Sequence, residues 1–305
     1  MADLAVKLGT LALQNPVIAA SGTFGYGLEY EDLADLDSLG GIVVKGLSLR
    51  PMQGNPTPRI VETASGMLNS IGLANIGVDA FLSEKLPKLR KYSRVKIFAN
   101  VYGHSIDEYA AVAAKLSGAE GLAGIEVNLS CPNVTQGGLA FGTDPKTVAA
   151  ITRAVRDAYA GFLMVKLTPN VTDVTEIARA AQDGGADAVS LINTLAGLAV
   201  DLETRRPVLG GVTGGLSGPA IKPVALRMVW QTARAVSIPV VGMGGIMTGR
   251  DALEFMLVGA TAVQVGTANF ANPRACVEIA DQMNEWLDGH GIKSAGLLIG
   301  AIANG

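Results

Sequence analysis

Eight short apolar runs, most of them followed by a turn and a helical pattern, limit what this sequence can fold into. The runs are rich in Val, Ile and Leu and end at small or polar residues, and they cover residues 16–21, 41–46, 96–103, 124–130, 162–168, 188–194, 238–246 and 262–267. Short, nearly continuous apolar runs are typical of strands buried on both faces. Their alternation with helical segments predicts a parallel sheet.

Helical spacing of apolar residues fills most of the intervals between these runs. The predicted helices cover residues 106–116, 144–159, 172–184, 219–236, 248–258 and 273–287. Asp144 followed by Pro145 indicates an N-cap and a first helical position. Eight strands alternating with helices predict one α/β domain over residues 1–305, an eight-stranded parallel (β/α)8 TIM barrel. An open doubly wound sheet is the rival, but no G-x-G-x-x-G follows the first strand.

Two connections, 47–95 and 195–237, are much longer than the others. Insertions that follow a barrel strand lie at its C-terminal, catalytic face, so we expect both there. The alternating segment 6–13 predicts an N-terminal hairpin at the opposite end. The uncharged stretch 255–273 approaches the length of a membrane-spanning helix. Polar residues and glycines interrupt it, which predicts separate short elements and no membrane span.

Composition excludes several classes of protein. The formal net charge is -3 and no run of Lys and Arg exceeds two residues, which disfavours a nucleic-acid binder. Cys131, Cys276, His104 and His290 cannot build a disulfide framework or a Cys/His zinc site, so we expect no metal. Two cysteines fit a reducing compartment, and residues 1–4 do not start a signal peptide. We therefore expect a cytoplasmic protein.

The carboxyl ends of the predicted strands, where a barrel enzyme has its active site, carry polar residues. They include two lysines and several amides but no carboxylate and no histidine: Ser21, Lys45, Gly46, Asn100, Asn128, Lys166, Asn193, Thr194, Gly244, Gly245, Gly266 and Thr267. Such a set disfavours a catalytic triad, a carboxylate pair or a metal site. It favours a planar, anionic, amide-rich ligand. The glycines at the last two strands favour a phosphate, with plain turn glycines as the alternative.

Cys131 is the residue that most favours a specific chemistry. It stands in a strand-end turn before Pro132, which restricts it to extended backbone. The ordinary role of a cysteine is that of an inert, buried side chain, and its place among polar strand ends favours a functional thiol instead. Cys276 lies in an apolar helical pattern, and we expect it in the core.

The stretches 128–133 (NLSCPN), 69–73 (NSIGL), 45–46 (KG) and 241–246 (VGMGGI) resemble the class 1 dihydroorotate dehydrogenases. The resemblance runs almost from end to end. It implies an FMN-containing barrel that oxidises dihydroorotate to orotate in pyrimidine biosynthesis. FMN would take the hydride, and Cys131 would be the base that takes the proton.

The resemblance also implies which residues hold each ligand. The substrate would be held by Lys45, Asn69, Ser70, Ile71, Gly72, Leu73, Asn128, Asn133, Asn193 and Thr194. FMN would be held by Ser21, Lys45, Gly46, Asn100, Asn128, Lys166, Ile192, Gly218, Gly244, Gly245, Gly266 and Thr267. Lys166 would stabilise negative charge on the reduced flavin. Lys45 and the N–H groups near Gly72 would receive the orotate carboxylate.

The stretch 134–145 (VTQGGLAFGTDP) resembles the NAD-linked class 1B. In that class a homodimer of this chain forms a heterotetramer with an electron-transfer subunit that carries FAD and a [2Fe-2S] cluster. This fits a chain with no NAD fingerprint and too few cysteines for a cluster. The cysteine base, and a start without a membrane extension, argue against the membrane-bound, serine-based class. Three alternatives stay open: a stand-alone fumarate-linked class 1A enzyme, a phosphate-binding barrel isomerase or lyase without flavin, and a non-catalytic binding barrel.

Overall fold

A closed ring of eight parallel strands forms the centre of the computed structural model, which describes residues 1–129, 135–136 and 139–303. The barrel strands are β3 (Val17–Ala19), β4 (Gly41–Leu47), β7 (Lys96–Val101), β8 (Gly124–Asn128), β11 (Phe162–Lys166), β12 (Ala188–Leu191), β17 (Val240–Met243) and β18 (Ala262–Val265). The ring closes where β18 pairs with β3, with Val263 opposite Val17. The predicted (β/α)8 barrel is confirmed.

Several strands stop before the predicted carboxyl end of their apolar run. Within the run at 188–194, strand pairing ends at Leu191, and within the run at 124–130 it ends at Asn128. Residues just beyond the ladder, such as Asn193 and Thr194, line a cavity instead. The ends of the apolar runs therefore belong to the functional face rather than to the sheet.

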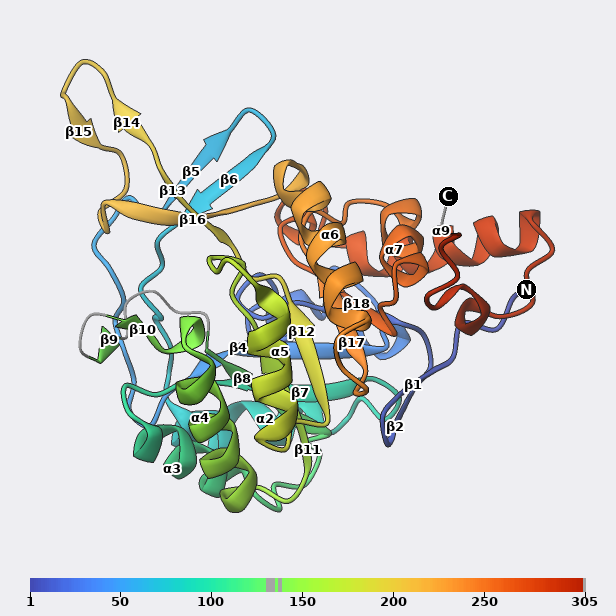
Figure 1. The fold of residues 1–305 in the computed structure, drawn as a ribbon, viewed down its shortest axis with the longest axis horizontal. Helices are drawn as coiled ribbons and strands as arrows, with labels where there is room; N and C mark the ends of the chain where they lie inside the picture. The colour runs from blue at the N-terminus through green and yellow to red at the C-terminus, as the bar shows by residue number, and fades with distance from the viewer. Residues whose placement is uncertain (130–134, 137–138, 304–305) are drawn as a thin grey trace.

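In the described part of the chain, six helices have nine or more residues: α3 (Ile106–Leu116), α4 (Pro145–Ala158), α5 (Val174–Asp183), α6 (Lys222–Ala233), α7 (Gly249–Leu257) and α9 (Ala275–Gly289). They surround the barrel (Figure 1). Each coincides with a predicted helix. Asp144 is the N-cap of α4, as predicted, and its carboxylate accepts a hydrogen bond from the Thr147 N–H at 2.9 Å. Pro145 occupies the first turn, where its missing N–H costs nothing.

The shorter elements lie in the connections. They are α1 (Val78–Ala80), the π-helix η3 (Phe81–Lys85), α2 (Leu86–Leu89), α8 (Ala268–Ala271) and the 3-10 turns η1 (Leu28–Tyr30), η2 (Leu36–Ser38), η4 (Phe141–Thr143), η5 (Pro219–Ile221) and η6 (Ala295–Leu298). A two-residue ladder joins β9 (Thr135–Gln136) to β10 (Leu139–Ala140). The stretch 255–273 divides among α7, β18 and α8, which confirms separate elements. No helix in the described part of the chain is long and apolar enough to cross a membrane.

The N-terminal hairpin and the two insertions lie at opposite ends of the barrel (Figure 1). The hairpin pairs β1 (Val6–Leu8) with β2 (Leu11–Leu13), and its turn residue Gly9 lies against the ring of Phe162 at the start of β11. It is therefore at the N-terminal end of the strands, as predicted.

The insertions at 47–95 and 195–237 combine into one small antiparallel sheet. Its strands, in spatial order, are β13 (Leu195–Leu198), β16 (Thr213–Ser217), β6 (Gly66–Asn69) and β5 (Ile60–Thr63). A further hairpin of β14 (Val200–Asp201) and β15 (Arg206–Pro207) extends from it. The pairing of β16 with β6 joins segments that are almost 150 residues apart in the chain, Asn69 lying opposite Gly215. This sheet forms one wall of the cavity described below.

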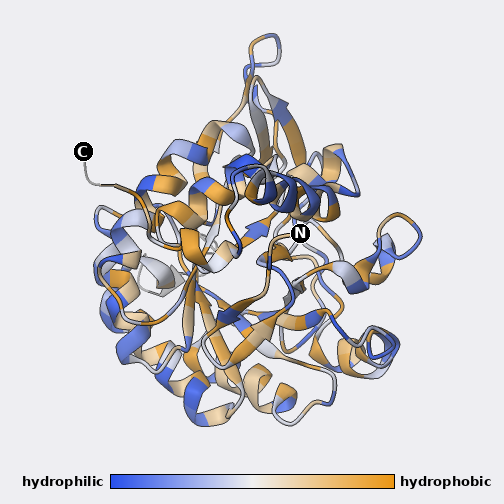
Figure 2. Ribbon diagram, turned by 90° about the vertical axis from the view of Figure 1, so that its right-hand side faces the viewer, coloured by the Kyte–Doolittle hydropathy of each residue, from blue (hydrophilic) through white to orange (hydrophobic). Residues whose placement is uncertain are grey.

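Apolar side chains fill the space between strands and helices. Figure 2 shows mainly hydrophobic ribbon in the strands and mixed colouring in the surrounding helices, as expected for helices with one buried face. The barrel interior also encloses polar groups, because Glu126 and Ser190 are both 0% exposed. Buried polar groups of this kind need hydrogen-bond partners, and they lie directly below the functional face.

Candidate active site

A cavity of about 390 Å³ opens at the carboxyl ends of the barrel strands, beneath the insertion sheet. With two exceptions, every residue singled out from the sequence for a substrate or flavin role lines it: Ser21, Lys45, Gly46, Asn69, Ser70, Ile71, Gly72, Leu73, Asn100, Asn128, Lys166, Ile192, Asn193, Thr194, Gly218, Gly244, Gly245, Gly266 and Thr267. The exceptions, Cys131 and Asn133, lie outside the described residues. The structure thus brings these residues together from both barrel and insertions.

Two lysines supply the positive charge of the cavity. Lys166, at the end of β11, is 5% exposed and forms no salt bridge within the described residues. Lys45 extends from β4, and burial together with the nearby Arg59 guanidinium lowers the pKa of its ammonium group. No Asp or Glu is among the described lining residues. An anionic ligand would supply the negative charge that pairs with these ammonium groups.

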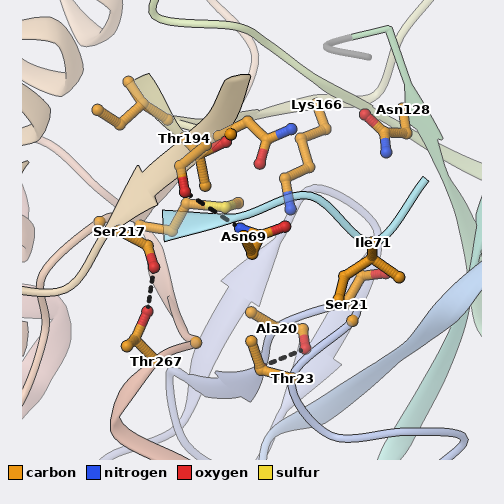
Figure 3. A pocket seen from close by; sticks show the side chains of 18 of the residues that line it. Ala20, Ser21, Thr23, Asn69, Ile71, Asn128, Lys166, Thr194, Ser217 and Thr267 are labelled. Carbon is orange, nitrogen blue, oxygen red and sulfur yellow. Dashed lines mark hydrogen bonds between the residues drawn. The ribbon is translucent and has the colours of Figure 1, made fainter. Parts of the chain in front are cut away.

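Asn69 and Thr194 meet at the seam between the barrel and the insertion sheet, close to Lys166 in Figure 3. The Asn69 amide nitrogen donates to the carbonyl oxygen of Gly215 at 3.2 Å, which fixes the side chain across the β6–β16 pair. A Cβ on Gly215 would overlap the Thr194 hydroxyl, so this position has to be glycine. The seam therefore presents an amide and a hydroxyl to the cavity in fixed positions.

The turn at 70–73 forms another part of the wall. Gly72 has φ 70° and Leu73 has φ 60°, so two successive residues are in the left-handed region. Asn55 stabilises the start of the turn, since its amide donates to the Ser70 hydroxyl at 2.9 Å and to the Ser70 carbonyl at 3.2 Å. Such a turn brings backbone groups to the cavity surface.

A corner rich in glycine lies where β17 and β18 end. Gly218, Gly244 and Gly245 all have positive φ, and a Cβ on Gly245 would come within 2.9 Å of the Gly218 carbonyl. The Thr267 hydroxyl donates to Ser217 at 2.8 Å on the edge of this corner, as Figure 3 shows. Backbone at the wall of a glycine-rich corner suits a phosphate group.

The start of helix α7 contributes less to this corner than a free helix N-terminus would. Asp251 accepts hydrogen bonds from the Met247 and Thr248 N–H groups at 2.9 Å, which completes a capping box. The Gly249 N–H donates to the Gln282 side chain at 2.8 Å. Most donors of the first turn are therefore already used.

A buried carboxylate below the cavity was missed by the sequence analysis. Glu126 on β8 accepts hydrogen bonds from Asn100 at 2.7 Å, Ser190 at 2.8 Å and Gln264 at 2.6 Å. The signal was present, because a glutamate two residues before Asn128 in an apolar strand faces the same side of the sheet as that asparagine. Glu126 lies one layer deeper than the strand ends, where a barrel enzyme has its active-site residues.

Comparison with known proteins decides the family. The sequence matches the family described as dihydroorotate dehydrogenase over residues 3–287. The chain belongs to the dihydroorotate dehydrogenase family.

Two dihydroorotate dehydrogenase relatives show which class the chain resembles. Both carry the name "Dihydroorotate dehydrogenase B (NAD(+)), catalytic subunit", one from Geobacter sp. (strain M21) and one from Trichlorobacter lovleyi. Each is 59% identical to this chain, over 300 and 299 residues, and each comparison covers 98% of both sequences. The predicted likeness to class 1B is confirmed.

A solved dihydroorotate dehydrogenase confirms the barrel architecture. The crystal structure of the enzyme from Eimeria tenella in complex with ferulenol superposes with a TM-score of 0.81, covering 98% of this chain and 88% of that one. The two sequences are 22% identical, so this similarity concerns the fold alone.

Proposed function

We propose that this chain is the FMN-containing catalytic subunit of an NAD-linked dihydroorotate dehydrogenase and oxidises dihydroorotate to orotate. The observation that carries the proposal is a single cavity whose described lining has two lysines, several amides and no carboxylate. Full-length relatives with this name support the reaction and the class. One barrel domain would hold both ligands.

The cavity suits FMN on two independent grounds. Its glycine corner, built from Gly218, Gly244 and Gly245, brings backbone to the cavity wall, where a phosphate can contact it. Buried acceptor oxygens on Asn100 and Gln264 have no partner in the described structure, which suits a ring with an N–H group. When bound, FMN supplies the acceptor for the substrate hydride.

The chain's own residues bind and orient the substrate. Lys45 supplies a cation for the orotate carboxylate, helped by backbone N–H groups of the turn near Gly72. Hydrogen-bonding groups for the pyrimidine ring come from Asn69, Asn128, Asn193 and Thr194. Asn133 joins them by its place in the sequence motif. The substrate is thereby held in one orientation for transfer.

Cys131 removes the substrate proton in this proposal. Its place in the NLSCPN motif supports the assignment, because that motif begins at Asn128 in the cavity wall. A thiol has an ordinary pKa of about 8.5, so the rate should rise with pH toward that value. Lys166 stabilises the negative charge that accompanies hydride transfer.

Electrons leave through a second protein. The whole sequence has two cysteines, whereas a [2Fe-2S] cluster needs four ligands, so the cluster and its FAD belong to an electron-transfer subunit. The assembly we propose is a cytoplasmic heterotetramer built on a homodimer of this chain. Its small-molecule partners are dihydroorotate and orotate.

The test is to purify the chain alone and assay dihydroorotate oxidation with NAD, fumarate and an artificial dye. We expect a yellow protein that reduces the dye, and that reduces NAD only after its partner subunit is added. Direct use of fumarate would overturn the class 1B assignment in favour of class 1A. A colourless protein that binds no FMN would overturn the flavoenzyme proposal. Cys131→Ala at wild-type turnover would exclude the thiol as the base.

A further inference from the structure

Glu126 collects three hydrogen bonds inside the barrel, and all three come from other strands. The donors are the amide nitrogens of Asn100 on β7 and Gln264 on β18, and the hydroxyl of Ser190 on β12. In the ring of eight strands, β18 lies opposite β8, so the carboxylate spans the barrel interior. Glu126 does not line the cavity, whereas both amide side chains do.

The carboxylate determines which way these two amides face. Each amide turns its NH2 group to Glu126, which leaves its carbonyl oxygen directed elsewhere. These oxygens, Asn100 Oδ1 and Gln264 Oε1, are buried and accept no hydrogen bond from any described residue. Reversing either amide would place its oxygen against the carboxylate, and two acceptors repel at that distance. The orientation is therefore imposed from below.

The oxygen of Asn100 lies beside the cavity wall. A Cβ built on Gly46, which lines the cavity, would come 2.9 Å from Asn100 Oδ1. Both amide side chains are 1% exposed, so bulk water does not satisfy their oxygens. A buried acceptor without a partner is costly, typically about 1–3 kcal/mol. A ligand N–H would remove that cost.

We propose that Glu126 is a positioning residue that fixes two side chains, Asn100 and Gln264, as hydrogen-bond acceptors. These two side chains form the floor of the cavity, and the floor then selects a ligand ring whose edge carries an N–H group. This rests on the proposed function, in which the ligand at the floor is FMN. The pyrimidine ring of a flavin has one imide N–H between two carbonyls, and Lys166, which lines the same cavity, offers a cation for a carbonyl oxygen. Glu126 acts on the flavin only through the two amides.

Glu126→Gln is the sharpest test because it changes almost no volume. The new side chain has an NH2 group, which needs an acceptor among the same three neighbours. One amide then turns its oxygen downward and its NH2 group toward the cavity floor. The NH2 group at the floor would then face the imide N–H of FMN, and two donors cannot form a hydrogen bond. FMN affinity should therefore fall by about tenfold or more.

The readout is the ratio of two dissociation constants on flavin-free protein, for FMN and for FMN methylated at the imide nitrogen. The methyl group removes the donor, so the wild-type chain should prefer FMN by at least about tenfold. In Glu126→Gln that preference should drop by about the same factor. A purely steric effect of the methyl group, or a general loss of stability, would leave the ratio as it is in the wild type.

Ser190→Ala is the matched control, since it removes the third donor to the carboxylate and leaves both amides bound to it. We expect it to keep the wild-type ratio. If Glu126→Gln does not fold, as judged by circular dichroism, Gln264→Met removes one acceptor directly and should also lower the preference. An unchanged ratio in whichever of these two variants folds overturns the inference. Failure of the wild-type chain to bind FMN at all would instead overturn the proposed function.

Discussion

The hydroxyl of Tyr102 donates a hydrogen bond of 3.0 Å to the carbonyl oxygen of Leu73. Leu73 has φ 60°, a left-handed conformation that costs a residue with a Cβ roughly 1–2 kcal/mol. The Asn75 amide donates to the same oxygen at 2.8 Å. Two hydrogen bonds from outside the turn therefore hold a strained residue that lines the cavity.

Tyr102→Phe should loosen this turn without touching the glycine corner. The substitution removes the contact with Leu73 together with the contacts of the same hydroxyl with Asn75 and Met52. Loss of a hydrogen bond typically costs about 1 kcal/mol, so orotate should bind roughly fivefold more weakly and the KM for dihydroorotate should rise. FMN content should stay at the wild-type level. Isothermal titration with orotate and the flavin absorbance of the purified protein measure the two effects.

Tyr159→Phe is the control for that variant. Tyr159 is also buried, at 4% exposure, but it ends α4 and does not line the cavity. It should leave orotate binding unchanged. Equal effects of the two substitutions on orotate affinity would refute a specific role for the Tyr102–Leu73 contact.

Orotate binding should weaken at high pH because of Lys45. Burial, and then the neighbouring Arg59, hold the pKa of this lysine below 10.5. Above the lowered pKa the folded, ligand-free chain has a neutral amine at this position, which no longer attracts the carboxylate. By the same shift, the free chain gains stability as pH rises from the lowered pKa to about 10.5.

The measurement is the orotate dissociation constant between pH 7 and 10, in Cys131→Ser so that thiol ionisation does not contribute. Lys45→Met in the same background should weaken binding by about 10-fold or more at pH 7, since a charge-assisted hydrogen bond is lost. It should also flatten the pH profile. The assignment is wrong if Lys45→Met keeps the same alkaline loss of affinity.

The barrel was predictable because each of its strands carries its own signal. A strand such as β11 is buried along its whole length, so its apolar run is visible in five residues. The insertion sheet has no such signal. β5 alternates exposed and half-buried residues, and β16 includes two glycines, so neither resembles a core strand. β5 pairs with its neighbour in the chain, β6, but the pairing of β16 with β6 spans almost 150 residues, which local sequence does not encode.

The cavity residues were predictable to the extent that they follow strand ends or a known motif. Lys166 and Asn128 are in register at the ends of adjacent strands, so topology alone brings them together. Glu126 was missed because its role depends on amides from β7 and β18, which meet only when the barrel closes. The assignments of Cys131 and Asn133 remain predictions from the motif.

Asp144→Ala should destabilise the fold by about 1 kcal/mol, because the N-cap of α4 loses its acceptor for the Thr147 N–H. Hydrogen bonds from Thr147 hold the pKa of the Asp144 carboxyl below 3.8. The charged cap therefore stabilises the fold above about pH 3.8, and its contribution is lost as pH falls through the lowered pKa. Thermal unfolding at pH 7 and at acid pH measures both effects.

Asp144→Asn keeps an acceptor at the cap, so it should unfold at a temperature between those of the wild type and Asp144→Ala at pH 7. The gap between wild type and Asp144→Asn should close in acid. A gap of constant size at every pH would show that the carboxylate charge contributes nothing to the cap.

The two cysteines should differ sharply toward an alkylating reagent such as iodoacetamide. Cys276 is 1% exposed and donates to the Asn269 side chain at 3.3 Å, and burial raises the pKa of its thiol to about 12. The thiolate is the reactive form, so Cys276 should stay unmodified in the folded chain at pH 8. A thiol that serves as a base has to reach the substrate, so Cys131 should react, and orotate should protect it. Mass spectrometry should therefore find one label on the folded wild-type chain and none on folded Cys131→Ser. After unfolding in denaturant, the wild-type chain should carry two labels. Labelling of folded Cys131→Ser would mean that Cys276 is more accessible than its packing allows, and a folded wild-type chain without any label would exclude an accessible thiol at position 131.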